Sequence, residues 1–214
     1  RLYDWLRDDT ARAVLTHLHA GTDYQQHMLR FIENHDEARA ATAFGPGRDL
    51  AAAVLIATLP GASLIHEGQM AGHKIRLPVQ LGRRPLEPAD RAVEDFYRLL
   101  LAEAKQSVYH GGTWNLRECM PAWDLNASNR NLIAYTWRAG EGDATERRLI
   151  VVNYSAHGSQ GQVPMRNFGL AGREWHLHDL LHPGDSYRRT GAAMVDPGLY
   201  IDLHPWQAHI FRFE

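Results

Sequence analysis

Apolar positions in the first half of the chain follow two different spacings. Three segments have apolar residues at helical spacing, and two shorter apolar runs are typical of buried strands. In chain order these predict a helix over residues 2–18, a strand over 27–33, a helix over 50–59, a strand over 62–66 and a helix over 88–106. Asp49 is the expected N-cap of the middle helix. This alternation predicts a parallel sheet covered by helices, as in the end of a larger α/β unit.

The pattern changes after His110-Gly111-Gly112, which we take as a boundary. Short β-rich runs separated by turns follow it. Apolar positions alternate through Trp206, Ala208 and Ile210. The runs cover residues 113–119, 131–138, 147–155, 161–165, 174–181, 185–190 and 199–214. Strands at this spacing predict an antiparallel β-sandwich. We therefore expect a mixed fold, with an α/β part over residues 1–109 and the sandwich over residues 110–214.

Composition narrows the classes of function. A length of 214 residues suits one large domain or two modest ones, and a net charge of −2 argues against nucleic-acid binding. No apolar run is long enough to span a bilayer. Cys119 is the single cysteine, which rules out an internal disulfide and slightly favours the cytoplasm, although the compartment stays open. The sequence opens within a predicted helix and without methionine, so we expect a fragment that lacks its upstream part.

Polar side chains follow both predicted parallel strands. Asn34-His35-Asp36 comes after the first strand, and His66-Glu67-Gly68-Gln69 comes after the second. In parallel α/β barrels the active site forms at the carboxyl ends of the strands. We therefore expect these two loops to be neighbours at one rim.

These residues resemble a known family. Phe31, Asn34, His35 and Asp36 match the F-x-x-N-H-D motif that follows the seventh barrel strand of the alpha-amylase family, glycoside hydrolase family 13. The stretch from Leu59-Pro60-Gly61 to Gly68-Gln69 is similar to the eighth-strand signature of that family. The order of elements also matches, so the resemblance covers essentially the whole chain. It implies the last part of a (β/α)8 barrel followed by an antiparallel C-terminal domain.

The resemblance implies retaining cleavage or transfer of α-glucosidic bonds in an α-glucan or maltooligosaccharide. Asp36 matches the carboxylate that stabilises the positive charge of the transition state, and His35 matches the histidine that hydrogen-bonds the sugar. Asn34 and Arg39 complete the expected substrate-binding set, with Arg39 placed to fix a carboxylate by paired hydrogen bonds. The resemblance implies no cofactor or metal ligand in this segment and leaves a calcium site to the upstream part.

Two parts of the family's machinery are missing from the sequence. The nucleophile motif, arginine-x-aspartate, and the acid/base glutamate belong upstream of Arg1, because Arg48-Asp49 comes after the N-H-D motif and at a helix start. The chain alone is therefore expected to be inactive. His66, Glu67 and Met70 also differ from the residues that are frequent in the family at those positions.

Simpler interpretations stay open for each candidate. Asp36 can cap a turn, His35 can be a structural histidine, Arg39 can be a surface charge and Glu67 can be a solvated loop carboxylate. His176 and His178 share a strand face, as a metal site requires, but no third ligand is visible.

The tryptophans after the boundary are expected mainly in the core. Trp123, which lies between turn residues, is the best candidate for an exposed sugar-stacking ring.

Two other functions fit the same sequence. The chain can be a carbohydrate-binding or structural module whose sandwich is the working part. It can also belong to a transglycosylase, an isomerase or an inactive member of the family. In each case, exposed apolar strands at residues 28–33 and 62–66 are expected to favour self-association.

Overall fold

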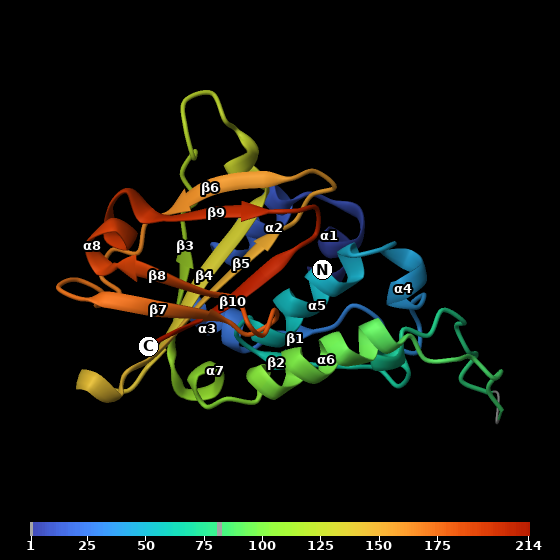
Figure 1. Ribbon diagram of the computed structural model, residues 1–214. Coiled ribbons are helices and arrows are strands. Elements are labelled where there is room, and N and C mark those ends of the chain that lie inside the picture. Colours follow the sequence, from blue (N-terminus) through green and yellow to red (C-terminus); the bar gives the residue numbers. More distant parts are fainter. Residues whose placement is uncertain (1, 81–82) are drawn as a thin grey trace.

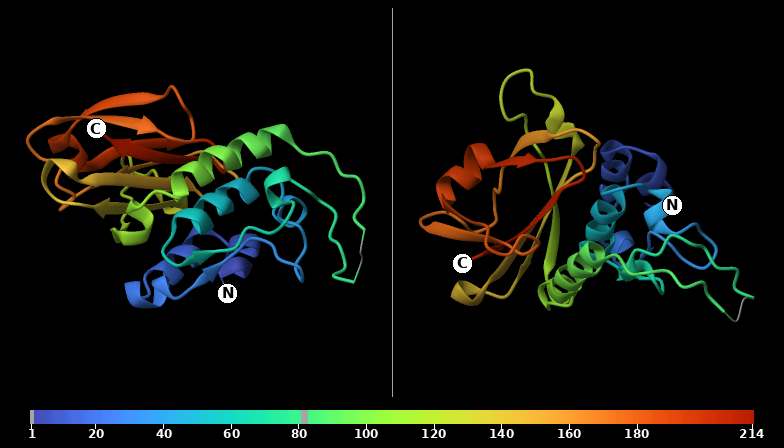
Figure 2. Two further views of the ribbon diagram at one scale, coloured as in Figure 1. Left: turned by 90° about the horizontal axis from the view of Figure 1, so that it is seen from below. Right: turned by 45° about the vertical axis from the view of Figure 1, so that its right-hand side comes forward.

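The computed structural model describes residues 2–80 and 83–214, which form three layers (Figure 1). Helices from the first half of the chain make one layer, a six-stranded antiparallel sheet makes the middle layer, and a short two-stranded sheet covers the other side. Figure 2 shows the helices on one side of the large sheet. The mainly antiparallel sheet that the second half predicts is therefore confirmed.

The first half contains two short strands among helices. The strands are β1 (Leu29–Arg30) and β2 (Ala62–Ser63). The helices are α1 (Leu2–Asp8), α2 (Ala11–Leu18), α3 (Thr22–Gln26), α4 (Ala40–Ala43), α5 (Arg48–Thr58), the 3-10 turn η1 (Gln69–Ala71), α6 (Arg91–Ala104) and α7 (Val108–Gly111).

The second half supplies the antiparallel strands. These are β3 (Thr113–Arg117), β4 (Leu132–Ala139), β5 (Glu146–Asn153), β6 (Ser159–Val163), β7 (Glu174–Asp179), β8 (Ser186–Thr190), β9 (Leu199–Leu203) and β10 (Ala208–Phe213). The short helical turns between them are η2 (Ser128–Asn131), η3 (Gly142–Ala144), α8 (Gly191–Ala193) and η4 (Met194–Gly198).

β1 and β2 pair in parallel and are joined through α5. Leu29 lies opposite Ala62 and Arg30 opposite Ser63. The backbone N–H of Leu64 extends the pairing by donating to the carbonyl of Arg30, at 2.8 Å. The predicted strands over residues 27–33 and 62–66 are therefore too long, because backbone pairing ends while the apolar side chains continue.

Two expected helix boundaries in this half are wrong. The helix predicted over residues 2–18 breaks between α1 and α2. Thr10 has an extended backbone there, and its N–H donates to Oδ1 of Asp9, at 2.9 Å. Gly47, and not Asp49, is the N-cap residue of α5; its φ of 80° is a conformation that glycine tolerates well. Asp49 instead lies in the first turn of the helix, where the negative charge of a carboxylate interacts favourably with the helix dipole.

The large sheet has the strand order β3-β4-β5-β10-β7-β8, and its central strands are buried on both faces. In β4, Ile133 and Tyr135 point into the core beneath the helices, whereas Leu132 and Ala134 point into the core shared with β6 and β9. This double cover explains the nearly continuous apolar runs of β4 and β5. It also corrects the alternation predicted near the C-terminus, because β10 is a central strand that is apolar on both faces.

Polar contacts tie the helices to the sheet. The hydroxyls of Thr58 and Tyr135 are 2.6 Å apart, and Nε1 of Trp137 donates to the carbonyl of Thr58, at 2.7 Å. From α6, Glu103 forms a buried ion pair with Arg148 of β5, at 2.5 Å. One hydrophobic core therefore continues across the boundary at residues 109 and 110.

The tryptophans divide between the core and the surface. Trp114, Trp137 and Trp175 are buried, whereas Trp123 is 55% exposed on a loop that projects from the large sheet. The predicted exposure of Trp123 is therefore confirmed. In the described part of the chain, the helices all lack the length and hydropathy required to cross a membrane.

Candidate functional site

The candidate residues begin where the chain leaves β1. Ile32 and Glu33 are buried at the end of this segment, and Asn34 then turns the backbone outward. Oδ1 of Asn34 accepts hydrogen bonds from the backbone N–H of Asp36, at 2.8 Å, and of Glu37, at 3.0 Å. Asparagine commonly stabilises turns in this way. Asn34, rather than Asp36, therefore makes the hydrogen bonds of the turn.

His35 and Asp36 lie side by side at the surface. Nε2 of His35 is 3.3 Å from Oδ2 of Asp36, and the two side chains are 64% and 76% exposed. An ion pair this exposed contributes little to stability. Both groups are therefore open to a ligand, and the Asp36 carboxylate is not enclosed in a buried ion pair.

Arg39 lies beneath this loop and is buried. Its Nη1 is 2.9 Å from Oε1 of Glu33, and its Nη2 donates to the backbone carbonyl of Glu67, at 2.8 Å. Nη1 also lies 2.7 Å from Nδ1 of His66. Oε2 of Glu33 in turn accepts the backbone N–H of Ala40, at 2.6 Å. Arg39 thus joins the loop after β1 to the loop after β2.

His66 has two neighbours at the same ring nitrogen. Nδ1 of His66 is 2.7 Å from Nη1 of Arg39 and 3.2 Å from Oε1 of Glu33. A guanidinium can only donate, so Nδ1 accepts from Arg39 when it carries no proton and donates to Glu33 when it carries one.

The loop after β2 is held from within. Oε1 of the buried Gln69 accepts the backbone N–H of His66, at 3.2 Å, and its Nε2 donates to the hydroxyl of Tyr97 on α6, at 2.8 Å. Gly68 has a φ of 82°, and a Cβ there would collide with the guanidinium of Arg39 and with His73. Glycine is therefore required where the two loops meet. Glu67 is exposed and pairs with Arg84.

The structure brings the two loops to one rim, as the sequence predicts. His35 and Asp36 form the exposed tip of the first loop beside the half-buried Asn34, and Arg39 lies below them against the second loop. Sequence reasoning missed Glu33, the buried partner of Arg39. Its only signal is an acidic residue at the end of an apolar run.

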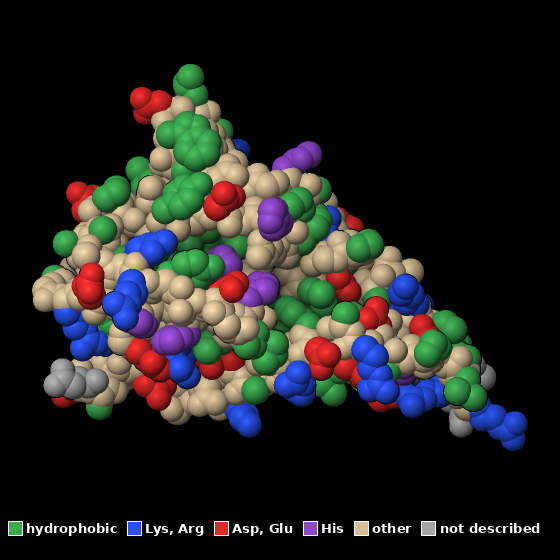
Figure 3. All heavy atoms as spheres, in the orientation of Figure 1, with side chains coloured by type: hydrophobic (Ala, Val, Ile, Leu, Met, Phe, Trp, Pro, Cys, Tyr) green, Lys and Arg blue, Asp and Glu red, His purple; other side chains and the backbone are tan. Residues whose placement is uncertain are grey.

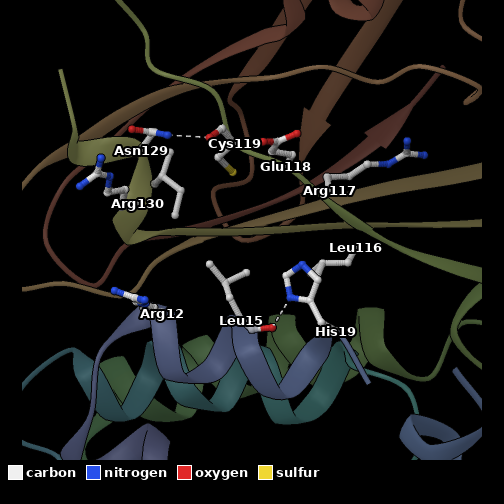
Figure 4. Close-up of a pocket in the computed structure, with 10 residues that line it drawn as sticks. Arg12, Leu15, His19, Leu116, Arg117, Glu118, Cys119, Asn129 and Arg130 are labelled. Atoms are coloured by element: carbon white, nitrogen blue, oxygen red, sulfur yellow. Dashed lines mark hydrogen bonds between the residues drawn. The ribbon is translucent and has the colours of Figure 1, made fainter. Parts of the chain in front are cut away.

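The clefts of the molecule differ in their relation to this rim. A cleft of about 600 Å³ adjoins the second loop and is lined by Glu67, Gly68 and Tyr97. A larger cleft of about 930 Å³ lies between α2 and the segment from β3 to η2, where Leu15 and His19 face Cys119 and Asn129 (Figure 4). Its lining includes none of the four predicted site residues. Cleft size therefore does not identify the candidate site, which is defined by the two loops.

No family model and no curated protein matches this sequence. Solved structures do match. A noncanonic maltogenic alpha-amylase from Thermotoga neapolitana has a TM-score of 0.76 at 18% identity, covering 98% of this chain and 47% of that one. An alpha-amylase from Geobacillus thermoleovorans, complexed with acarbose, has a TM-score of 0.67 at 16% identity, covering 100% and 46%. A debranching enzyme from Nostoc punctiforme has a TM-score of 0.60 at 18% identity, covering 94% and 38%.

These matches establish the fold. The chain has the fold of the C-terminal region of alpha-amylase-type structures, and it spans about half or less of the length of each matching structure. The family resemblance that the N-H-D motif indicates is therefore matched by the three-dimensional arrangement.

Proposed function

We propose that this chain is the C-terminal part of a retaining enzyme that acts on α-glucans, and that its two rim loops contribute to the sugar site. The observation that carries this proposal is the arrangement of the loops, which leave neighbouring parallel strands at the same end and are joined by Arg39. Catalytic residues of (β/α)8 enzymes lie at this end of the strands. We assign residues 1–109 to the end of such a barrel and residues 110–214 to a β-sandwich domain.

Each rim residue has a role in this proposal. The exposed carboxylate of Asp36 stabilises the positive charge that develops on the sugar during bond cleavage. His35 hydrogen-bonds a sugar hydroxyl beside the cleaved bond. Asn34 shapes the turn that presents both side chains, and Arg39 fixes the position of that turn relative to the second loop. The nucleophile and the general acid come from the upstream part of the parent enzyme.

The proposal is tested first on residues 1–214. We expect no turnover of starch or maltooligosaccharides by this chain alone, because one stabilising carboxylate supplies neither a nucleophile nor a proton donor. The codons upstream of Arg1 should encode an arginine-x-aspartate motif and a glutamate after the next strand. Clear turnover by the purified chain would contradict the assignment of the missing carboxylates.

The second test uses the full parent protein. Asp36→Asn should lower kcat by about 100-fold or more, as expected when a group that stabilises transition-state charge is removed. Asp23→Asn is the matched control, since Asp23 is 95% exposed on α3. Unchanged kcat in Asp36→Asn would remove Asp36 from the catalytic assignment. Analysis of the products then separates hydrolysis from transfer or isomerisation.

A carbohydrate-binding function is the second candidate. Trp123 is 55% exposed on the projecting loop, and Tyr200 on β9 is 45% exposed (Figure 3 shows apolar side chains on this part of the surface). Exposed aromatic rings offer an apolar face with a polar edge, which suits sugars. Glucan binding that survives Asp36→Ala but is lost in Trp123→Ala would favour this candidate over the catalytic one.

Self-association is proposed for the edge formed by β1 and β2. Leu29 is 55% exposed there and Ala62 is exposed beside it, whereas Ile32 is buried, so the exposed apolar surface is smaller than the expected run over residues 28–33. An exposed apolar edge favours pairing with another chain. Light scattering that shows a strict monomer would contradict this expectation.

A further inference from the structure

Asp179, His182 and His209 converge at the junction of β7 and β10. Asp179 ends β7, His182 follows in the turn toward β8, and His209 lies on β10. Oδ2 of Asp179 is 2.6 Å from Nδ1 of His182 and 2.6 Å from Nδ1 of His209. All three residues are remote in sequence from the proposed sugar-site loops.

The Asp179 carboxylate is fully buried. Its Oδ1 accepts the backbone N–H groups of Leu181, at 3.1 Å, and Ile210, at 3.3 Å. Within the described residues its ion-pair partners are His182 and His209, without lysine or arginine. A buried carboxylate therefore faces two imidazole nitrogens.

This set of atoms matches the requirements of a transition metal. The ligating atoms of the three residues lie within 4.8 Å of one another. Zinc binds imidazole nitrogen and carboxylate oxygen at about 2.1 Å, and tetrahedral geometry then separates neighbouring ligand atoms by about 3.4 Å. The two contacts at Oδ2 would open by about 0.8 Å to admit the ion.

The surroundings allow this adjustment. The His182 side chain is 41% exposed and lies on a turn, so it is free to rotate outward. A cleft of about 370 Å³, lined by Asp179, Pro183 and Leu99 of α6, adjoins the cluster, and outward rotation of His182 would open the buried carboxylate to solvent. His209 lies on a central strand, with 11% of its side chain exposed, and provides a fixed ligand.

We propose that Asp179, His182 and His209 bind one divalent transition-metal ion, and that zinc is the best match. Magnesium and calcium do not fit, because they prefer sites made of oxygen ligands. The ion binds Nδ1 of each imidazole, whose remaining proton then lies on Nε2. It supplies the positive charge beside Asp179 and fixes the β7–β8 turn against β10. Three protein ligands leave a fourth position for water.

The test uses residues 1–214, freed of metal with EDTA and titrated with Zn²⁺ or, for spectroscopy, with Co²⁺. We expect one ion per chain, the visible absorption of tetrahedral Co²⁺, and a higher Tm with Zn²⁺. His182→Ala should weaken Zn²⁺ binding by more than about 100-fold, since even loss of a hydrogen-bond partner of a metal ligand costs about 10- to 100-fold. Its far-UV circular dichroism should be unchanged.

His176→Ala is the matched control, because His176 lies on β7 outside the cluster, and it should bind Zn²⁺ like the unmodified chain. His209→Asn is a second variant that removes a ligand from the sheet itself. Failure of the unmodified chain to bind one Zn²⁺ would overturn the proposal and leave a purely hydrogen-bonded cluster. Binding that persists in both ligand variants, or that His176→Ala abolishes, would overturn it equally.

Discussion

Arg39→Met breaks the buried ion pair beneath the candidate site. The side chains of Arg39 and Glu33 are only 6% and 1% exposed, so solvent cannot replace the lost partner. The Glu33 carboxylate would remain buried without the guanidinium, beside the backbone N–H of Ala40 and the ring of His66. Breaking a buried ion pair by removing one partner costs about 3–5 kcal/mol. For a protein of this length the corresponding decrease in Tm is roughly 6–20 °C.

Equilibrium urea unfolding, followed by tryptophan fluorescence, measures this free energy. In the double variant Glu33→Gln/Arg39→Met the amide oxygen still accepts from Ala40, and no buried charge remains. We therefore expect the double variant to be more stable than Arg39→Met alone. Arg91→Met is the control: its ion pair with Glu94 is exposed, so the change should stay within about 0.5 kcal/mol.

The reasoning would be refuted by a loss of less than about 1 kcal/mol in Arg39→Met. It would also be refuted by a double variant that is less stable than the single one. Either result would mean that an uncompensated buried charge does not set the cost of the substitution.

Two further predictions concern other titratable groups. Burial, assisted by the charge of Arg30, lowers the pKa of His17, so the unfolded chain binds a proton more readily than the folded chain and the free energy of unfolding decreases as pH falls below about 6.5. His17→Gln should therefore reduce the difference in unfolding free energy between pH 7.5 and pH 5.5. An equal difference in the variant and the unmodified chain would contradict the prediction. Burial raises the pKa of the Cys119 thiol to about 12, so little reactive thiolate is present at pH 8. Alkylation of Cys119 by iodoacetamide at pH 8 should therefore be on the order of a thousandfold slower in the folded chain than in the urea-unfolded chain. Equal rates in the two states would contradict this prediction.

The antiparallel strands could be predicted from the sequence because each is a separate apolar run. The run at residues 131–138 becomes β4, and the run at 147–155 becomes most of β5. Both are buried on two faces, so almost every residue carries the signal. The strand order could not be predicted, since it depends on pairing between distant segments, such as β10 between β5 and β7.

The parallel pair shows where this reasoning fails. The run at residues 27–33 is apolar enough for a full strand, yet only Leu29 and Arg30 are paired. Side-chain pattern reports burial, whereas strand length also depends on where the partner backbone turns away. The same segment contains Arg30, which is buried and donates to the carbonyl of Pro60, at 2.8 Å.

The sequence predicted that the loops after the two parallel strands would be neighbours, but it did not predict the buried contacts that hold these loops together. The loops after the two strands meet, as expected from parallel pairing. The pairing of Glu33 with Arg39 follows no helical or strand periodicity, so the spacing of six residues gave no signal. The cluster at Asp179 was missed for a related reason: His209 is distant in sequence and reaches it only through the register of β10 with β7.

The large sheet has no solvent-facing side at its centre, and this affects how the molecule can be divided. Separating the helices from the strands near residue 110 would strip the cover from Tyr135 and Trp137, which bond Thr58 across that junction. Each piece would then expose to solvent the apolar surface that the other piece covers in the intact chain. The two halves should consequently melt as one cooperative body, and neither is suited to being produced as an independent module.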